Sequence, residues 1–199
     1  WRKNSAATRL GQNINDVEDA VKKQDMIYFS GITLAILDPS SRNNLFSCLK
    51  SARRAGKKIA FDPNLRPKLW SDKKEMCDVI MAGAKLSDII LPSFEDEKTW
   101  FSDTDPMSTL KRYRKVGAEI VVVKNAGEPV SFISNQGAGT HPVETIRTVV
   151  DSTAAGDSFN SEILVGILRK TPLTEAIKNG ANLAKKVIMG HGALIKNDI

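Results

Sequence analysis

The chain has 199 residues, of which 41% are hydrophobic. A chain of this size buries about 70% of the surface that its unfolded form exposes, so it needs no metal or disulfide to hold a core. The chain has only two cysteines and no apolar run near the ~20 residues of a membrane helix. This argues against a disulfide framework and a membrane partner and favours a cytoplasmic location. The formal net charge is +6, but aromatic residues make up only 6% and do not interleave with the basic ones, which argues against a nucleic-acid partner.

Short β-rich runs alternate with longer helical stretches, an order that is typical of βαβ units around a mostly parallel sheet. Continuous apolar runs indicate buried strands. The strands predicted in this way are residues 26–30, 58–61, 89–91, 120–123 and 130–133. The helices predicted between them are residues 41–55, 72–86 and 106–116, with Ser71 as the N-cap of the second.

The last third of the chain combines a turn-rich stretch with two helices. Residues 135–140 (Asn-Gln-Gly-Ala-Gly-Thr) predict a hairpin connection and hence one antiparallel edge. Helices are predicted over residues 156–169 and 173–189, with Pro172 at the start of the second, where its missing N–H costs nothing. Because no repeat, low-complexity tract or Gly/Ser linker interrupts the pattern, we expect one α/β domain over residues 1–199.

In such sheets, ligands bind outside the carboxyl ends of the strands. The candidate sites are therefore the segments that follow a strand or that lead into the first turn of a helix. The sharpest is residues 151–159, Asp-Ser-Thr-Ala-Ala-Gly-Asp-Ser-Phe, where small residues lead into an apolar helix. Small residues and a helix N-terminus favour an anion, and Asp157 in the first turn can take a proton from a hydroxyl that attacks a phosphate. The alternative is that Asp157 only complements the helix dipole while the alanines pack.

Three further segments follow predicted strands. In residues 61–70, the planar guanidinium of Arg66 can bind a carboxylate or a phosphate. A surface turn that contains an arginine by chance explains this segment equally well. Residues 91–97 include three acids that suit magnesium or, alternatively, an acidic first turn of a helix. Residues 124–129 join two strands and are compatible with a simple hairpin turn. The chain has neither a P-loop nor a Gly-x-Ser-x-Gly elbow, which argues against a P-loop enzyme and against a lipase-like hydrolase.

Together these segments resemble the ribokinase-like, or PfkB, family of sugar kinases, whose C-terminal signature is similar to residues 151–157. Residues 154–160 and 62–70, with Trp1-Arg2, look most like the 2-keto-3-deoxygluconate kinases within that family. Fructokinases share the segment 62–70 and are the nearest rival, beside other sugar kinases of the family. An inactive nucleotide-binding fragment is the alternative outside the enzyme class.

The resemblance implies a three-layer α/β/α fold with a mostly parallel sheet. It also implies that the 199 residues correspond to the C-terminal two-thirds of the family chain, without its N-terminal strands and β-lid. On that basis we expect these residues alone to bind nucleotide weakly and to show little or no kinase activity. A homo-oligomer is compatible with the resemblance.

The resemblance further implies ATP-dependent, Mg²⁺-assisted phosphorylation of a sugar acid. Asp157 is the expected base, and the backbone of Ala154, Ala155 and Gly156 is the expected anion hole. The residues matched to the sugar are Arg2, Arg66 and Asp157. Those matched to the nucleotide are Asn64, Lys124, Gly127, Ala154, Gly156 and Asn182. Asp96 is matched to the magnesium-organising position, since Ser93-Phe94-Glu95-Asp96 stands where the family often has Asn-x-x-Glu.

Overall fold

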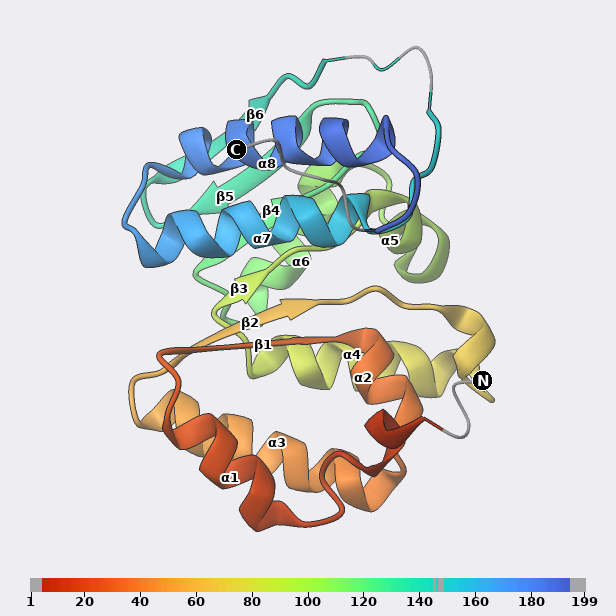
Figure 1. The fold of residues 1–199 in the computed structure, drawn as a ribbon, viewed down its shortest axis with the longest axis vertical. Helices are drawn as coiled ribbons and strands as arrows, with labels where there is room; N and C mark the ends of the chain where they lie inside the picture. Colours follow the sequence, from red (N-terminus) through yellow and green to blue (C-terminus); the bar gives the residue numbers. More distant parts are fainter. Residues whose placement is uncertain (1–4, 145, 147–148, 194–199) are drawn as a thin grey trace. The chain divides into compact units, whose positions relative to one another are not determined.

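The computed structural model describes residues 5–144, 146 and 149–193 (Figure 1). Within these residues the strands form one six-stranded sheet in the order β1-β2-β3-β4-β5-β6. Their bounds are β1 Met26–Ser30, β2 Lys58–Asp62, β3 Ile89–Ile90, β4 Ile120–Val123, β5 Val130–Ser134 and β6 Gly137–His141. All five predicted strands are therefore confirmed, and β6 is additional.

Strands β1 to β4 pair in parallel. Phe29 is the register partner of Phe61, and Phe61 is that of Ile90. Strands β5 and β6 are neighbours joined by two residues, which is too short for a parallel crossover, so this edge is antiparallel as predicted. The predicted turn was too long, however, because residues 137–140 lie in β6. Pairing with β5 overrides the weak strand propensity of their glycines.

The helices alternate with the strands as expected. Their bounds are η2 Ala6–Arg9, α1 Ile14–Lys22, α2 Gly31–Ile36, α3 Pro39–Arg54, η3 Pro67–Leu69, α4 Lys73–Lys85, α5 Phe94–Phe101, α6 Pro106–Lys115, α7 Ala155–Leu168 and α8 Leu173–Ile188. The five predicted helices are confirmed to within two residues at each end, and α5 is the helix that the acidic segment allowed. Helices α1 and α2 were not predicted. No helix in the described ranges is both long and apolar enough to cross a bilayer.

Two details at helix starts differ from the prediction. The N-cap of α4 is Asp72, not Ser71, and its carboxylate accepts the Glu75 N–H at 2.7 Å. A carboxylate adds charge that favours the helix dipole, so it caps better here than the neighbouring hydroxyl. Pro172 is the N-cap of α8 and so precedes the first turn instead of lying in it.

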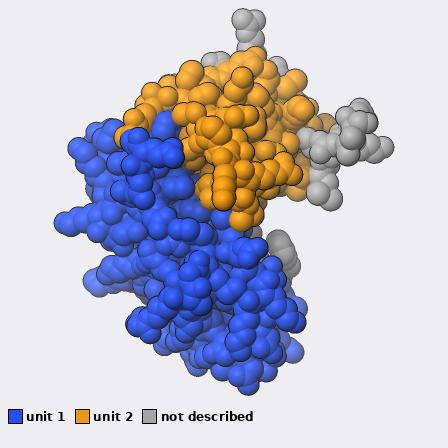
Figure 2. Space-filling model, turned by 90° about the vertical axis from the view of Figure 1, so that its left-hand side faces the viewer, with its two compact units in different colours: residues 1–123, 132–137 blue, residues 124–131, 138–199 orange. Residues whose placement is uncertain are grey.

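The chain divides into two compact units (Figure 2). One comprises residues 1–123 and 132–137, and the other comprises residues 124–131 and 138–199. The expectation of a single domain over residues 1–199 stays a prediction, and each unit is described below by itself.

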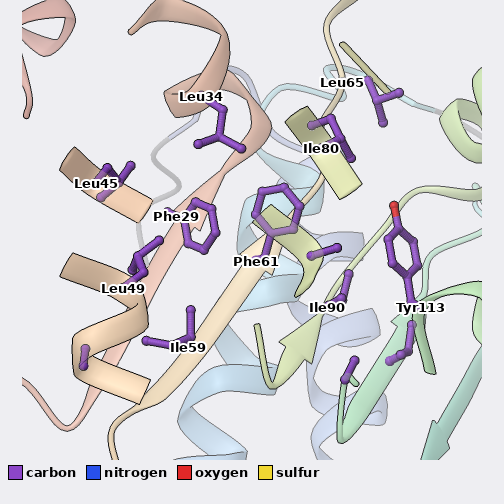
Figure 3. Packing of buried hydrophobic residues seen from close by; sticks show 14 of the residues in the cluster. Phe29, Leu34, Leu45, Leu49, Ile59, Phe61, Leu65, Ile80, Ile90 and Tyr113 are labelled. Atoms are coloured by element: carbon purple, nitrogen blue, oxygen red, sulfur yellow. The ribbon is translucent and has the colours of Figure 1, made fainter. Parts of the chain in front are cut away.

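The core of the first unit lies around β1 and β2 (Figure 3). The rings of Phe29 and Phe61 stack with their centroids 4.6 Å apart. Gly31, at the start of α2, packs against the backbone that follows β2, since a Cβ there would lie 1.7 Å from the Pro63 carbonyl oxygen. The absent side chain therefore lets α2 support the loop that carries Arg66.

In the second unit, α7 and α8 pack closely at two glycines. A Cβ on Gly166 would lie 2.6 Å from the Cβ of Ala176, and one on Gly180 would lie 3.0 Å from the Phe159 carbonyl oxygen. Close approach of the two helix backbones thus needs glycine at both positions. This packing holds α7, whose first turn is the sharpest candidate site.

Candidate active site

Helix α7 begins at Ala155, within one residue of the start that the sequence predicted. Ala154 is the N-cap in a left-handed conformation, φ 63° and ψ 7°, and its carbonyl accepts the Ser158 N–H at 2.8 Å. The Ala155 N–H is already engaged, because it donates to the Ser152 carbonyl at 3.3 Å. The Gly156 and Asp157 N–H groups make no hydrogen bond to another described residue. The donors left for an anion in the first turn are therefore those of Gly156 and Asp157.

The turn before α7 is held by Asp151, a residue for which the sequence predicted no separate role. Its carboxylate accepts the Thr153 N–H at 2.8 Å and the Gly192 N–H at 3.0 Å. These hydrogen bonds, from Thr153 first and then Gly192, hold the pKa of Asp151 below its usual value. Aspartate side chains commonly accept the backbone N–H two residues on, as in an Asx turn, so an aspartate at the head of a turn before a helix is the signal that predicts this role.

Asp157 lies in the first turn of α7 with its side chain exposed. At the preceding residue, Gly156, an added Cβ would have no heavy atom within 4 Å. The helix start is thus open on this side, which lets a ligand approach the backbone closely. A carboxylate beside unpaired N–H groups suits proton removal from a hydroxyl next to a bound phosphoryl group.

Lys124 belongs to the same unit and contacts α7. It follows β4 directly, and its Nζ donates to Oδ1 of Asn160 at 2.9 Å. The turn that begins at Lys124 is closed by the Glu128 N–H, which donates to the Asn125 carbonyl at 2.7 Å. Gly127 occupies a left-handed position in it, with φ 94°, as a glycine readily does. The predicted nucleotide residue Asn182 is exposed on α8.

In the first unit, the loop after β2 is polar and tightly braced. The Asp62 carboxylate accepts the Asn64 N–H at 3.2 Å. Asn64 and Arg66 are both left-handed, with φ 28° and 46°, although neither is glycine. Between them Leu65 is fully buried, and its carbonyl accepts the Trp70 indole N–H at 2.8 Å. These contacts hold the exposed side chain of Arg66 on a fixed backbone.

Asp96, in the first turn of α5, lies close to this loop. Burial raises the pKa of its carboxyl, and this effect is opposed by a hydrogen bond from the Leu65 backbone and by the charge of Arg66. The first unit therefore brings Arg66 and Asp96 together. The described residues contain no group of three His, Cys, Asp or Glu side chains that could hold a metal alone. A single carboxylate fits Mg²⁺ that is otherwise bound by phosphates and water, which is the way Mg²⁺ is usually held in kinases.

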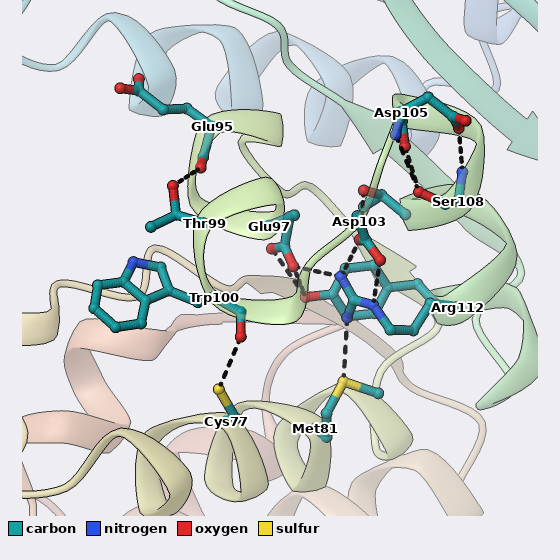
Figure 4. Close-up of polar contacts among 12 residues, drawn as sticks. Cys77, Met81, Glu95, Glu97, Thr99, Trp100, Asp103, Asp105, Ser108 and Arg112 are labelled. Carbon is teal, nitrogen blue, oxygen red and sulfur yellow. Dashed lines mark hydrogen bonds and ion pairs between the residues drawn. The ribbon is translucent and has the colours of Figure 1, made fainter.

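Glu97 is not available to a metal, because it lies in a buried ion cluster with Asp103, Arg112 and Tyr113 (Figure 4). Arg112 donates at 2.6 Å to a carboxylate oxygen of both Glu97 and Asp103. The Tyr113 hydroxyl lies 3.0 Å from both Glu97 oxygens. One of the three acids of residues 95–97 is therefore structural, and it ties α5, which carries Asp96, to α6.

Burial raises the pKa of Glu97 from 4.5 to about 7, and the charge of Arg112 offsets this only in part. The folded chain thus holds this proton more tightly than the unfolded chain does. The stability from this group is fully present below pH 4.5 and is lost as the pH rises through 7. Other groups facing Glu97 are Asp103, Tyr113 and Cys77.

We therefore expect the wild-type protein to lose stability relative to Glu97→Gln as the pH rises between these two values. The slope of the difference should not exceed about 1.4 kcal/mol per pH unit, the maximum for one proton. Urea unfolding of both proteins at several pH values measures it. Parallel pH profiles of the two unfolding free energies would contradict the protonation of Glu97.

The predicted site residues thus form two groups, one in each unit. Arg66, Asn64 and Asp96 belong to the first unit, whereas the second holds Lys124, Gly127, Asn182 and residues 154–157. Arg2 lies outside the described residues, so its pairing with a sugar acid stays a prediction. The sequence did not predict that Asn160 contacts Lys124, and only its place in the segment 154–160 hinted at a role.

Comparisons with known proteins identify the family to which the chain belongs. The family model described as pfkB family carbohydrate kinase matches residues 1–199. Over 98% of its length the chain is 36% identical to a 2-dehydro-3-deoxygluconokinase from Haemophilus influenzae, of which it covers 63%. A similar structure is a PfkB protein from Polaromonas sp. JS666, with a TM-score of 0.82 and 29% identity, over 95% of this chain and 61% of that one.

A second similar structure is an aminoimidazole riboside kinase from Salmonella enterica, complexed with aminoimidazole riboside and an ATP analog. It has a TM-score of 0.73 and 25% identity, over 84% of this chain and 57% of that one. The chain thus spans less than two thirds of the length of these relatives. The likeness confirms the predicted ribokinase-like α/β fold with its mostly parallel sheet. By sequence and by fold, the chain belongs to the pfkB family of carbohydrate kinases.

Proposed function

We propose that the whole protein transfers the γ-phosphoryl group of ATP to a hydroxyl of 2-keto-3-deoxygluconate, the compound also called 2-dehydro-3-deoxygluconate. The observation that carries the proposal is the start of α7, where the Asp157 carboxylate lies in the turn whose Gly156 and Asp157 N–H groups bond to no other residue that the structure describes. The substrate is supported by the 36% identical 2-dehydro-3-deoxygluconokinase, and the nucleotide by the riboside kinase solved with an ATP analog.

The residues of this chain supply positioning and charge, which are the main contributions to phosphoryl transfer. Asp157 takes the proton of the attacking sugar hydroxyl. The N–H groups at the start of α7 and the helix dipole stabilise the charge that develops on the transferred group. Asp96 would hold Mg²⁺, which neutralises phosphate charge when bound.

Arg66 is proposed to bind the carboxylate of the sugar acid with its planar guanidinium. A charge-assisted contact of this kind contributes roughly 1.5–3 kcal/mol. Arg66→Ala should therefore lower kcat/KM for 2-keto-3-deoxygluconate about tenfold to more than a hundredfold, with a smaller effect on neutral fructose. Lys68→Ala, which removes another exposed cation from the same loop, is the matched control and should change neither value. Equal losses on both sugars would contradict the assignment.

The proposed activity is tested by incubating the purified whole protein with γ-³²P-labelled ATP, Mg²⁺ and one sugar at a time. We expect the label in a phosphorylated sugar acid when 2-keto-3-deoxygluconate is present. Label that appears only as inorganic phosphate, or only in fructose phosphate, would overturn the proposal. The second outcome would favour a fructokinase.

A further inference from the structure

Trp70 closes the loop that follows β2 and lies four residues after Arg66. Its backbone N–H donates to the Pro67 carbonyl at 3.2 Å, and its indole N–H donates to the Leu65 carbonyl at 2.8 Å. The ring is half-buried and packs against the core of the first unit. Because an indole N–H in such surroundings needs an acceptor, the hydrogen bond fixes the direction of the Leu65 carbonyl.

The ring of Trp70 is in turn held by Arg42, a buried residue of α3. The guanidinium carbon of Arg42 lies over the ring, 5.3 Å from its centroid. Nε and Nη2 of Arg42 donate to the Leu34 and Leu37 carbonyls at 3.0 and 3.3 Å. Nη1 donates to Oε1 of Glu75 at 3.1 Å. A guanidinium with three fixed acceptors has little freedom to move, so it gives the ring a rigid surface to rest on.

The backbone next to these contacts is strained. Asn64 and Arg66 have φ 28° and 46°, in the left-handed region that residues other than glycine avoid. Leu65, between them, is a fully buried member of the core (Figure 3). Such a conformation persists only where the surrounding contacts impose it. The indole N–H of Trp70 supplies one of these contacts at the carbonyl that directly precedes Arg66.

This hydrogen bond acts on the conformation of Arg66 through a planar peptide. The Leu65 carbonyl and the Arg66 N–H belong to the same rigid peptide group, so fixing the carbonyl restrains φ of Arg66. The dihedral φ in turn sets the direction in which the exposed Arg66 side chain leaves the loop. A guanidinium pairs with a carboxylate through two parallel hydrogen bonds only in a narrow geometry. The fraction of molecules with the left-handed backbone therefore limits how well Arg66 binds an acid.

We propose that Trp70 is a positioning residue that sets the preference for a sugar acid, because it holds the Arg66 backbone in its left-handed conformation. The inference rests on the proposed function, in which Arg66 binds the carboxylate of the sugar. Trp70 is assigned no contact with the substrate, and Arg42 supports it by holding the ring.

The test compares kcat/KM for 2-keto-3-deoxygluconate with kcat/KM for fructose, in the whole wild-type protein and in Trp70→Phe. Phenylalanine keeps an aromatic ring beside Arg42 but lacks the indole N–H. We expect the ratio of the two values to fall about three- to tenfold, the effect of losing one hydrogen bond that holds the binding conformation. Effects of the loop on ATP act on both reactions and cancel in the ratio.

Trp100→Phe is the matched control. Trp100 is also half-buried in the first unit, but its indole N–H donates to no other residue that the structure describes. Its substitution should leave the ratio unchanged. Trp70→Phe combined with Arg66→Ala should give the same ratio as Arg66→Ala alone, because no guanidinium remains to be positioned.

Two further measurements do not depend on the behaviour of one variant. Hydrogen–deuterium exchange of residues 64–70 should be faster in Trp70→Phe than in the wild type or in Trp100→Phe, because the loop opens more often. Arg42→Lys keeps a cation beside Glu75 but lacks the planar guanidinium over the ring. It should lower the ratio in the same direction as Trp70→Phe, and it replaces that variant if the latter does not fold.

The outcomes separate the inference from the function on which it rests. A wild type without a preference for the sugar acid, or with a preference that survives Arg66→Ala, contradicts the proposed function, and the role of Trp70 in selectivity falls with it. A preference that depends on Arg66 but is unchanged in Trp70→Phe overturns the inference alone. So does a fall in the ratio that persists in full in the Arg66→Ala background.

Discussion

Asp157→Asn is expected to lower kcat by about 10²–10⁴-fold, which is the usual contribution of a general base. The amide keeps the size of the side chain but cannot accept the proton of the sugar hydroxyl. The backbone N–H groups of Gly156 and Asp157 are unchanged by the substitution, so the affinity for ATP should change much less. Steady-state kinetics of the whole protein measure both effects.

The matched control is Glu162→Gln, which removes the other carboxylate of α7 at a position one and a half turns further along. It should leave kcat close to the wild-type value. A near-normal kcat in Asp157→Asn would show that another group takes the proton.

Arg112→Met is expected to lower the free energy of unfolding by about 3–5 kcal/mol, the usual cost of removing one partner from a buried ion pair. The variant leaves the carboxylates of Glu97 and Asp103 without their cation. Both are buried, since Glu97 is 0% exposed and Asp103 is 8% exposed. Urea unfolding measures the loss. Lys111→Met removes an exposed cation from the same helix and serves as the control. If both variants were equally stable, the cluster would not stabilise α5 and α6.

Strands β2, β3 and β4 could be predicted because each contains an apolar run that the fold largely buries. Strands β1 and β5 were found from their apolar residues as well, although only part of each strand is buried. Helix α2 could not be predicted, because residues Gly31–Ile36 follow β1 directly and their apolar side chains continue the apolar pattern of that strand. Its N-cap residue, Ser30, makes no side-chain capping hydrogen bond. Strand β6 was missed for the opposite reason, because its glycines indicate a turn until pairing with β5 orders them.

The candidate site was predictable where its chemistry is local. The start of α7 and the turn after β4 are each contained in a few consecutive residues, so composition and spacing reveal them. The contacts that support the site join distant residues: Arg112 follows Glu97 by 15 positions, and Asn160 follows Lys124 by 36. No local pattern in a single sequence encodes such pairings. For the same reason, the sequence left all three acids of residues 95–97 as metal candidates, whereas the structure buries Glu97 with Arg112.

If the whole protein is the proposed sugar-acid kinase, its kcat/KM for 2-keto-3-deoxygluconate should exceed that for fructose. Both values are measured on one preparation with a coupled assay for ADP release. We expect a preference for the sugar acid of about tenfold or more, because the proposed charge-assisted contact of Arg66 acts on only one of the two sugars. Equal values, or a preference for fructose, would contradict it.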